Sequence, residues 1–504
     1  MSKIDLLLIN PPGEVSKLPM GLLWIASYVR EHGFSVKIID GVTQNIKKTL
    51  LKIDHDINIV GVTATTDTIL SAYYICRFIK KNISEKIICV IGGFHATALP
   101  KRTLKESMFD IAIVGEGELT MLDVLEKIKN KKFPDSVPGT VVKFGNKIIV
   151  NKPRELIKNL NILPFPAYDL IDIEMYFHGI RGRYGNSKRT VMLTVTRGCP
   201  YNCVFCASKT MWKRRVRFFS VDYIIKELQF LIQKYKIDGI SFFDDELFIN
   251  KKFIHELCDS LISTGISKKI IWSCQGRVDT IDRELIRKLK KAGCVLIRFG
   301  MESGSEDTLK FLKRNTTTVE QNKNAAVLCK EENMSCFGSF IIGSPFEKLN
   351  DIVKTINFIE TYIHDNVDVF VMVPYPGTDS WDIYTKNNFL RKSINWSDFI
   401  VEGKNEYSLP VIRTKNFTSE QLMNIKNYIR MNVTQPINSG KKIKKHNHRR
   451  EIEKILFGDT RLAKVTFNYR LRNIFSIIPI AISNPKKLIN YLSAKFKRFQ
   501  KRFY

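Results

Sequence analysis

The stretch Val195-Thr-Arg-Gly-Cys-Pro-Tyr-Asn-Cys-Val-Phe-Cys-Ala207 decides what kind of protein this chain can be. Its three cysteines, Cys199, Cys203 and Cys206, share one short loop. Three thiolates can hold three irons of a four-iron, four-sulfur cluster, which has four cysteine ligands when its coordination is complete. The sequence therefore predicts a cluster with one open iron that can bind another molecule.

Two other interpretations of these cysteines are a zinc site and a set of structural thiols without a metal. Zinc loops usually bring a second Cys or His pair at ligand spacing. Neither Cys258 nor His255 lies on a comparable loop. The spacing therefore favours the cluster.

The chain around the cysteines predicts a barrel of parallel strands. A β-branched run at 191–196 indicates a buried strand, and Arg197-Gly-Cys-Pro200 ends it with turn residues. Further strands are expected at 239–243, 270–273, 295–299, 339–342 and 369–373, with helical patterns between them. Six such units predict an open, partial (β/α)6 barrel, in which residues at the carboxyl ends of the strands carry the chemistry.

The cysteine spacing, C-x3-C-x-aromatic-C, resembles the signature of the radical S-adenosylmethionine superfamily. The resemblance implies that the open iron binds S-adenosylmethionine and that one electron breaks a carbon-sulfur bond to give a 5'-deoxyadenosyl radical. The cofactor then supplies the reactive species, and the protein places it. The same resemblance implies an external one-electron donor, a flavodoxin or a ferredoxin, as a partner.

The N-terminal part predicts a doubly wound, Rossmann-like α/β sheet. Apolar runs at 4–9, 35–39, 59–63, 87–91 and 111–114 alternate with helical patterns. In such a sheet, ligands bind outside the carboxyl ends of the strands. The loops at these ends contain Asn10-Pro-Pro12, Thr63-Ala-Thr-Thr66, Gly92-Gly-Phe-His-Ala-Thr97 and Gly115-Glu-Gly-Glu118. Glycines there let a bulky ligand approach the backbone.

These loops, together with Gly21-Leu22, resemble the cobalamin-binding domain that is fused to one large subfamily of radical S-adenosylmethionine enzymes. The resemblance covers residues 1 to about 400. It implies that cobalamin contacts Asn10, Pro11, Gly21, Thr63, Thr65, Gly92, Gly93, His95, Gly115 and Glu116. The alternative for this domain is a flavodoxin-like partner module without a cofactor.

One motif of classical cobalamin proteins is missing. Their Asp-x-His-x-x-Gly sequence provides a histidine below the cobalt, and Asp54-His55-Asp56 does not match it. His95 is expected to form a hydrogen bond with backbone or corrin amides rather than to bind cobalt. Cobalamin would then bind without a histidine beneath the metal.

Residues at the carboxyl ends of the barrel strands are candidates for binding S-adenosylmethionine. The resemblance assigns Glu302 to that contact and Gly343 to a turn beside the adenine. Asp244, Asp245, Ser273 and Arg277 follow the second and third strands and are further candidates. Helix capping is the alternative for the two aspartates. Tyr375 follows the last strand, where it faces either the substrate or the protein core.

Length and composition fit an intracellular enzyme with several domains. The chain of 504 residues predicts a cobalamin-binding domain at 1–135, a linker at 136–185, the barrel at 186–400 and a mostly helical, basic region at 401–504. Its ten cysteines are scattered rather than framed as disulfides, and no secretory signal is evident, which indicates a reducing, cytoplasmic location.

The C-terminal region carries half of the net charge of +30, because residues 441–504 contain 18 Lys and Arg against 3 Asp and Glu. An apolar stripe at helical spacing runs through Leu488, Leu492, Phe496, Phe499 and Phe503. A basic amphipathic helix of this kind indicates peripheral membrane contact. The alternative is a helix packed on its own barrel. Nucleic acid is not expected as a partner.

Taken together, the motifs predict a cobalamin-dependent radical S-adenosylmethionine enzyme that methylates an unactivated carbon of a small molecule. A cyclase or an oxidative or rearrangement enzyme with a hydrophobic substrate, such as a tetrapyrrole or a lipid, remains open. A tRNA methylthiotransferase would need three more cluster cysteines in the N-terminal domain, which Cys76 and Cys89 cannot supply. A cobalamin carrier or sensor without catalysis is the alternative from another class.

Overall fold

The computed structural model describes residues 4–13, 17–53, 57–182, 185–392, 394–400, 409–440 and 447–457. The chain divides into two compact units, Met1–Lys444 and Lys445–Tyr504. The second unit contains one described helix, α17 (His448–Phe457). The predicted stripe from Leu488 to Phe503 lies outside the described residues, and so does Asp54-His55-Asp56.

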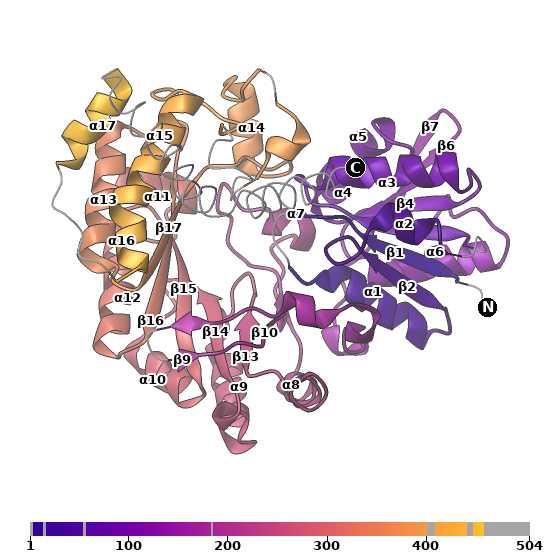
Figure 1. Cartoon of the computed structure of the whole chain (residues 1–504), viewed down its shortest axis with the longest axis horizontal. Coiled ribbons are helices and arrows are strands. Elements are labelled where there is room, and N and C mark those ends of the chain that lie inside the picture. The colour runs from indigo at the N-terminus through magenta and orange to yellow at the C-terminus, as the bar shows by residue number, and fades with distance from the viewer. Residues whose placement is uncertain are drawn as a thin grey trace, which may run out of the picture. The chain divides into compact units, whose positions relative to one another are not determined.

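The N-terminal sheet has five parallel strands in the order β2-β1-β3-β4-β5 (Figure 1). They are β1 (Leu6–Asn10), β2 (Val36–Asp40), β3 (Ile59–Thr63), β4 (Ile88–Gly92) and β5 (Ile111–Ile113). Each forms where the sequence predicts an apolar run. Two antiparallel strands, β6 (Thr140–Phe144) and β7 (Lys147–Val150), extend the same sheet. The sheet therefore continues past the expected domain boundary at residue 135.

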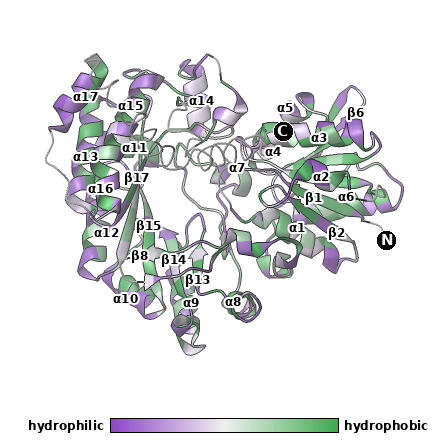
Figure 2. Ribbon diagram, in the orientation of Figure 1, coloured by the Kyte–Doolittle hydropathy of each residue, from purple (hydrophilic) through white to green (hydrophobic). Residues whose placement is uncertain are grey.

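Helices cover this sheet and bury its central strands. They are α1 (Met20–Glu31), α2 (Ile46–Leu50), α3 (Ile69–Asn82), α4 (Phe94–Ala98), α5 (Pro100–Lys105) and α6 (Glu118–Lys129). Leu6, Leu7 and Leu8 are consecutive and fully buried, as expected for a parallel strand with helices on both faces. Figure 2 shows hydrophobic strands and helices with hydrophilic outer surfaces.

The second sheet has six parallel strands in chain order, from β10 to β17. They are β10 (Thr190–Leu193), β13 (Gly239–Phe242), β14 (Ile271–Gly276), β15 (Cys294–Glu302), β16 (Ser335–Ile342) and β17 (Asn366–Val371). The helices between them are α8 (Val221–Tyr235), α9 (Lys251–Ser263), α10 (Arg283–Lys291), α11 (Glu306–Lys313), α12 (Val319–Glu331) and α13 (Leu349–Tyr362). Since β10 and β17 are the two edges, the barrel is open, and the predicted fold is confirmed (Figure 1).

Short elements complete the fold. Two small antiparallel pairs are β8 (Arg181–Gly182) with β9 (Gly185–Asn186) and β11 (Thr196–Arg197) with β12 (Arg217–Phe218). The remaining helices of the first unit are α7 (Ser208–Trp212), α14 (Asp379–Lys386), α15 (Ser419–Ile429) and α16 (Gln435–Asn438). The 3-10 turns are Leu160–Ile162, Tyr168–Leu170, Ile173–Tyr176, Ile266–Lys268 and Trp396–Asp398, and Arg430–Thr434 is a π-helical turn. Within the described ranges, no helix has the length and apolar character that crossing a membrane requires.

Candidate functional site

The loop with the three cysteines is held at its start by Asp244, which follows β13. The Asp244 carboxylate accepts hydrogen bonds from the backbone N–H groups of Val195 (2.8 Å) and Thr196 (2.6 Å). Its second oxygen is buried and has no hydrogen-bond partner among the described residues. Asp244 therefore orients the backbone that leads to Cys199 and does not cap α9, whose N-cap is Asn250. The contact of Asp244 with S-adenosylmethionine stays a prediction.

Gly198 fixes the path of this loop. Its φ is 98°, and a Cβ at this position would collide with the carbonyl oxygen of Arg215. This left-handed conformation favours glycine. The chain can therefore turn directly into Cys199.

None of the three cysteines forms a disulfide. Burial raises the pKa of Cys199 to about 11 and that of Cys206 to about 12. Within the described parts of the chain, no three His, Cys, Asp or Glu side chains converge as ligands of a single metal ion would. Thiolates that hold a cube of four irons need not do so, because each of them binds a different iron.

The surroundings of the cysteines fit an anionic iron-sulfur cluster. The Arg277 guanidinium stacks at 3.4 Å on the ring of Tyr201, and the Lys313 ammonium lies 5.9 Å from the ring centre of Phe205. Both aromatic residues belong to the cysteine loop, and the charges of Arg277 and Lys313 both interact with Cys203. Two cations therefore lie beside the three thiols, and each of them also pairs with a carboxylate, Asp279 or Glu302.

Glu302 ends β15 in a strained conformation. Its φ is 63°, and the register with β16 shifts between Gly300 and Glu302. The carboxylate folds back over Gly300, where a Cβ would collide with it, and pairs with Lys313 at 3.1 Å. Strain of this kind is typical of functional sites. Lys313 therefore connects Glu302 to the cysteine loop, because it contacts both Glu302 and Phe205.

Glu347 supports the turn at Gly343, and the sequence analysis missed it. The Glu347 carboxylate accepts hydrogen bonds from the N–H groups of Gly343 (2.6 Å) and Ser344 (3.3 Å). Tyr384 donates its hydroxyl hydrogen to the Gly343 carbonyl. Gly343 has a φ of 89°. An acid four residues after a glycine turn is the signal that could have revealed this contact.

Three further barrel residues that were expected to bind S-adenosylmethionine form hydrogen bonds or ion pairs with other side chains. Asp245 accepts a hydrogen bond from Ser208 (2.7 Å), two residues after the last cysteine. Arg277 pairs with Asp279 (2.9 Å). Ser273 is fully buried and donates to Ser241 (3.2 Å).

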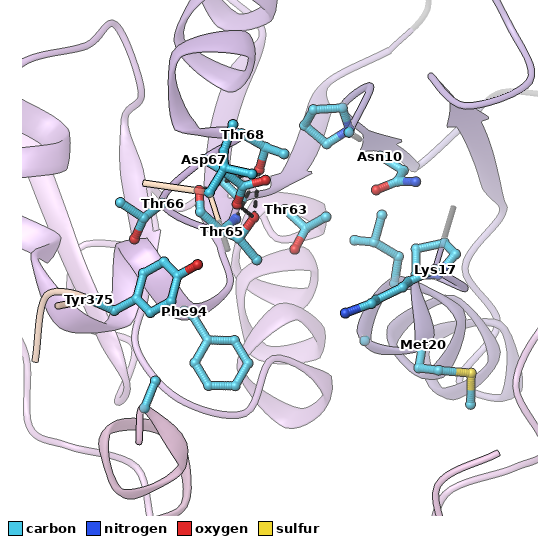
Figure 3. A pocket seen from close by; sticks show the side chains of 18 of the residues that line it. Asn10, Lys17, Met20, Thr63, Thr65, Thr66, Asp67, Thr68, Phe94 and Tyr375 are labelled. Carbon is cyan, nitrogen blue, oxygen red and sulfur yellow. Dashed lines mark hydrogen bonds between the residues drawn. The ribbon is translucent and has the colours of Figure 1, made fainter. Parts of the chain in front are cut away.

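A cavity of about 580 Å³ opens between the carboxyl ends of the N-terminal strands and the barrel. Residues of both domains line it: Asn10, Pro11, Gly13, Lys17, Met20, Gly21, Thr63 to Thr68 and Phe94 from the first, and Ala207, Thr210, Tyr375, Pro376 and Ile400 from the second. Figure 3 shows Lys17 pointing into this space from one side and Tyr375 beside Phe94 on the other. Ala207 directly follows Cys206, so the cysteine loop borders the cavity.

The candidates Asn10 and Tyr375 are tied into the protein. The Asn10 amide donates to Asp40 (2.9 Å), which also accepts from Tyr176 (2.6 Å). The Tyr375 hydroxyl donates to the Phe399 carbonyl (3.3 Å). Both nevertheless line the cavity.

A second cavity of about 370 Å³ lies against the central strands β1, β3, β4 and β5, and barrel residues including Arg197, Phe243 and Asp245 also line it. Its lining is largely apolar and includes the candidates Gly21, Thr63, Gly92, Gly93, Gly115 and Glu116 together with Leu8, Trp24, Ile25, Ile113 and Met121. Gly93 has a φ of 96°, and a Cβ there would lie 2.5 Å from the Ala64 carbonyl oxygen. Gly93 is therefore needed for the packing of its own loop against Ala64. A Cβ at Gly21 or Gly115 would meet no atom within 4 Å, so the lining is open there to a large ligand such as cobalamin.

His95 lies outside the linings of both cavities. It is buried, its Nδ1 forms a hydrogen bond with the Thr66 hydroxyl (3.2 Å), and Trp396 contacts its ring edge to face at 4.8 Å. Burial lowers its pKa to about 4. Nε2 has no hydrogen-bond partner among the described residues, so the expected bond to a corrin amide stays a prediction. That His95 is not a cobalt ligand stays a prediction.

A buried ion-pair network joins the two domains, and the sequence analysis missed it. Arg197, two residues before Cys199, donates hydrogen bonds to Glu116 and Glu118, each at 2.6 Å. Arg217 also pairs with Glu116 (2.8 Å). The Arg197 guanidinium lies over the ring of Trp24 at 4.6 Å. Two sequence features could have indicated this network. Arg197 and Arg217 lie on either side of the cysteine loop, and the loop from Gly115 to Glu118 contains two glutamates.

Glu116 was expected to contact a cofactor, and the structure gives it a different set of partners. One oxygen accepts from Arg197, and the other accepts from Arg217 and from the Ile157 N–H (2.7 Å). Its side chain borders the second cavity but is almost fully buried. The loop Gly115 to Glu118 therefore connects the domains as well as bordering a ligand cavity.

Comparison with known proteins identifies the two halves of this site. Residues 9–125 match the family model of the B12 binding domain, and residues 193–359 match that of the radical SAM superfamily. The "uncharacterized methyltransferase PH0819" of Pyrococcus horikoshii is 34% identical over 436 residues, which cover 84% of this chain and 90% of that protein. The chain belongs to the family of cobalamin-binding radical S-adenosylmethionine enzymes. Its cofactors are a 4Fe-4S cluster, S-adenosylmethionine and cobalamin.

Members of this family with solved structures share the fold. The radical S-adenosylmethionine methyltransferase TsrM of Kitasatospora setae, with cobalamin and a [4Fe-4S] cluster bound, has a TM-score of 0.63 at 16% identity and covers 77% of this chain and 76% of its own. The cobalamin-dependent S-adenosylmethionine radical enzyme OxsB has a TM-score of 0.68 at 18% identity, with 99% and 75% covered. At these identities the likeness concerns the fold.

Proposed function

We propose that this enzyme transfers a methyl group to an unactivated carbon of a small molecule, with cobalamin as the methyl carrier. The observation that carries the proposal is the shared cavity. Thr63 and Thr65 reach it from the N-terminal sheet, and Ala207 and Thr210 reach it directly after the last cysteine. A substrate in this space has access to both cofactor sites at once.

Some residues of the site would bind a cofactor directly, and others would fix the conformation of the residues that bind it. When bound, the cluster and S-adenosylmethionine supply a 5'-deoxyadenosyl radical, and cobalamin supplies the methyl group. Cys199, Cys203 and Cys206 would hold the cluster. Asp244 and Gly198 would keep the loop in the conformation that presents the thiolates.

Two further groups would position S-adenosylmethionine. Glu302 presents a carboxylate whose charge Lys313 partly balances, which suits contact with the amine or ribose of the cofactor. The Gly343 turn offers backbone groups that Glu347 and Tyr384 hold in place.

Arg197 would act as a positioning residue for the transfer. Its bonds to Glu116 and Glu118 connect the cysteine loop to the edge of the N-terminal sheet. Methyl transfer needs reacting atoms at about 3–3.5 Å. A rigid connection between the two cofactor sites therefore contributes directly to the rate.

Isotope labelling tests the proposed reaction. Protein reconstituted without oxygen is incubated with reductant, S-adenosylmethionine carrying a CD3 group, and small-molecule extract from a deletion strain. Methyl transfer predicts 5'-deoxyadenosine, S-adenosylhomocysteine and a product that carries the CD3 label. Formation of 5'-deoxyadenosine without S-adenosylhomocysteine or label would contradict it.

A second candidate function is cyclisation or another oxidative reaction of a hydrophobic substrate. The anaerobic magnesium-protoporphyrin IX monomethyl ester cyclase of Rubrivivax gelatinosus is 27% identical and covers 72% of this chain and 65% of its own length. The apolar character of the second cavity also admits a large ring. The labelling experiment distinguishes the two functions, because a cyclase product carries no CD3.

Two partners are proposed in addition to the substrate. An external flavodoxin or ferredoxin would supply the electron that the cluster needs. The basic region after residue 440 would contact anionic membranes, an idea supported by the sequence pattern from Leu488 to Phe503. Co-sedimentation with anionic vesicles, before and after truncation at Pro485, tests the second partner.

A further inference from the structure

The two faces of the barrel sheet can be told apart from their contacts. Trp272 on β14 donates its indole N–H to the carbonyl of Ala292, which follows α10, and Phe340 on β16 packs on Phe358 of α13. Both side chains therefore face the helices. Since side chains alternate along a strand, Ser273, Gln275, Phe337 and Ser339 face the inside of the barrel.

Arg298 belongs to this inner face. Its neighbours in β15, Ile297 and Phe299, are almost fully buried and alternate with it. The strand register places Arg298 between Gln275 on β14 and Phe337 on β16. Its guanidinium lies 5.5 Å from the centre of the Phe337 ring.

Below Arg298 the inside of the barrel is closed by apolar side chains. Ile180, Val295 and Leu296 form a buried cluster, against which Ile271 and Phe337 pack. Arg298 thus lies next to this apolar cluster, on the side towards the carboxyl ends of the strands. We call the cluster the floor of the barrel. From Arg298 to Glu302 the strand advances four residues, which is about 13 Å at the usual rise of a strand.

Arg298 is partly buried, and its guanidinium forms no ion pair within 4 Å among the described residues. Its Nε is buried and forms no hydrogen bond among the described residues. Burial lowers its pKa, and the two groups that counteract this effect are Cys274 and Asp368. Cys274 is a buried thiol on the opposite face. Asp368 is exposed on β17, in register with Ser339, and therefore shares the inner face with Arg298 two strands away and one layer higher.

Three other arginines in the described part of the barrel do have carboxylate partners, although the Nε of Arg197 is also buried without a hydrogen bond. Arg197 pairs with two glutamates, Arg277 pairs with Asp279, and Arg189 pairs with Glu174. A buried charge without a partner is costly, so a protein usually compensates it with a counter-charge. No described carboxylate pairs with Arg298 in this way, which leaves the site ready for an anion from outside the chain.

We propose that Arg298 binds an oxyanion of the substrate, a carboxylate or a phosphoryl group, on the inner face of the barrel. The planar guanidinium offers two parallel donors to such a group. Gln275 would add a donor from the next strand, and Phe337 would contact the adjoining apolar part. The acid end of the substrate then lies near the floor, and the remainder extends towards Glu302 and the cysteine loop. This inference rests on the proposed function, since it names the substrate class.

Calorimetric titration of the holoenzyme, loaded with cluster, cobalamin and S-adenosylmethionine, tests the site with three probes. They are phenylacetate, benzylphosphonate and the neutral phenylacetamide. We expect an oxyanion probe to bind and the amide to bind at least tenfold more weakly. The tighter of the two oxyanions identifies the group that the substrate carries. Arg298→Gln should weaken oxyanion binding at least tenfold, whereas Arg298→Lys should retain part of it.

Lys310→Gln is the matched control, because Lys310 is an exposed cation on α11 that lines neither cavity. It should leave oxyanion binding unchanged. Equal binding of oxyanions and amide, equal binding to wild type and Arg298→Gln, or loss with Lys310→Gln would overturn the proposal. So would an equal loss of S-adenosylmethionine affinity in Arg298→Gln, since Arg298 would then hold the carboxylate of the cofactor.

A crystal structure of the wild-type holoenzyme with benzylphosphonate keeps the test independent of any variant that fails to fold. Phosphonate oxygens at hydrogen-bond distance from the Arg298 guanidinium support the site, and a phosphonate elsewhere contradicts it. Formation of labelled product in the isotope experiment is measured separately. Failure of the substrate site can therefore be distinguished from failure of the proposed function.

Discussion

Glu302 and Lys313 form a buried ion pair of 3.1 Å between the end of β15 and the last residue of α11. Both side chains are less than a tenth exposed. Opposite charges in such a place stabilise each other, and removal of one leaves the other buried and unpaired, at a cost of about 3–5 kcal/mol. The orientation of Glu302 therefore depends on Lys313.

We expect Lys313→Gln to weaken S-adenosylmethionine binding at least tenfold, because Glu302 loses the partner that fixes it. Equilibrium binding to the reconstituted protein measures this effect. Lys310→Gln, an exposed change on the same helix, is the control and should bind normally. Unchanged affinity in Lys313→Gln would show that Glu302 is held by other contacts.

Replacement of Cys199, Cys203 or Cys206 by alanine should each abolish reductive cleavage of S-adenosylmethionine, because three irons need three thiolates. Production of 5'-deoxyadenosine is the measurement. Cys258→Ala and Cys294→Ala should retain cleavage, since both residues are buried in the helix layer and sheet core. Full cleavage in any variant of the first three would refute the cluster assignment.

Electron paramagnetic resonance of the cob(II)alamin form should lack the nitrogen splitting of an axial histidine. His95 lies within one of the predicted cofactor loops, Gly92 to Thr97, and its ring contacts Thr66 and Trp396. We expect the same spectrum from wild type and His95→Ala. A splitting that disappears in His95→Ala would identify this residue as a cobalt ligand.

Glu118→Gln should destabilise the junction of the domains, because Arg197 then keeps a buried charge with one fewer partner. The expected loss is about 3–5 kcal/mol, reduced by the remaining bond to Glu116. Hydrogen exchange of the amides in β11 and β12 and the melting temperature report it. Glu174→Gln, which removes an exposed pair with Arg189, should change neither measurement noticeably.

Stability should depend on pH through Glu227 on α8. Burial raises the pKa of Glu227 to about 8, although the Tyr168 hydroxyl donates a hydrogen bond to it (2.8 Å). A folded-state pKa above the unfolded value means that the folded state binds more protons, so this contribution is present below the unfolded pKa and is lost as the pH rises towards 8.

Glu227→Gln should therefore raise the melting temperature relative to wild type, and the difference should grow between pH 5 and pH 8. Glutamine keeps an acceptor for Tyr168 without a charge to bury. Thermal unfolding across this range is the measurement. A difference that is constant with pH would mean that Glu227 titrates normally in the folded protein.

The sequence predicted the parallel strands because each is an apolar run bounded by turn residues, and the cysteine loop because its spacing is specific. The hairpin of β6 and β7 was assigned to a linker, although Gly145-Asn146 between two β-rich segments is a hairpin signal. Gly145 has the positive φ of 56° that such a turn requires. The Gly145-Asn146 pair therefore predicts the β6–β7 hairpin from the local sequence alone.

Other features had no local signal. The bond from Arg197 to Glu118 joins residues 79 positions apart, and the strained φ of Glu302 depends on the register shift beside Gly300. Arg298 looks like any charged residue in a strand until the register shows which face it occupies. Long-range pairing decides these contacts, and composition or periodicity does not encode it.

The network of Arg197, Arg217, Glu116 and Glu118 has a consequence for protein engineering. Grafting the N-terminal half of another family member onto this barrel would bury two arginines opposite whatever side chains the donor happens to present. A chimera should fold stably when the donor domain has acidic residues at the positions of Glu116 and Glu118. Without them, the contact between the N-terminal domain and the barrel should be destabilised. Exchanging the arginines and the glutamates between the two domains would then make each modified domain pair only with its own modified counterpart.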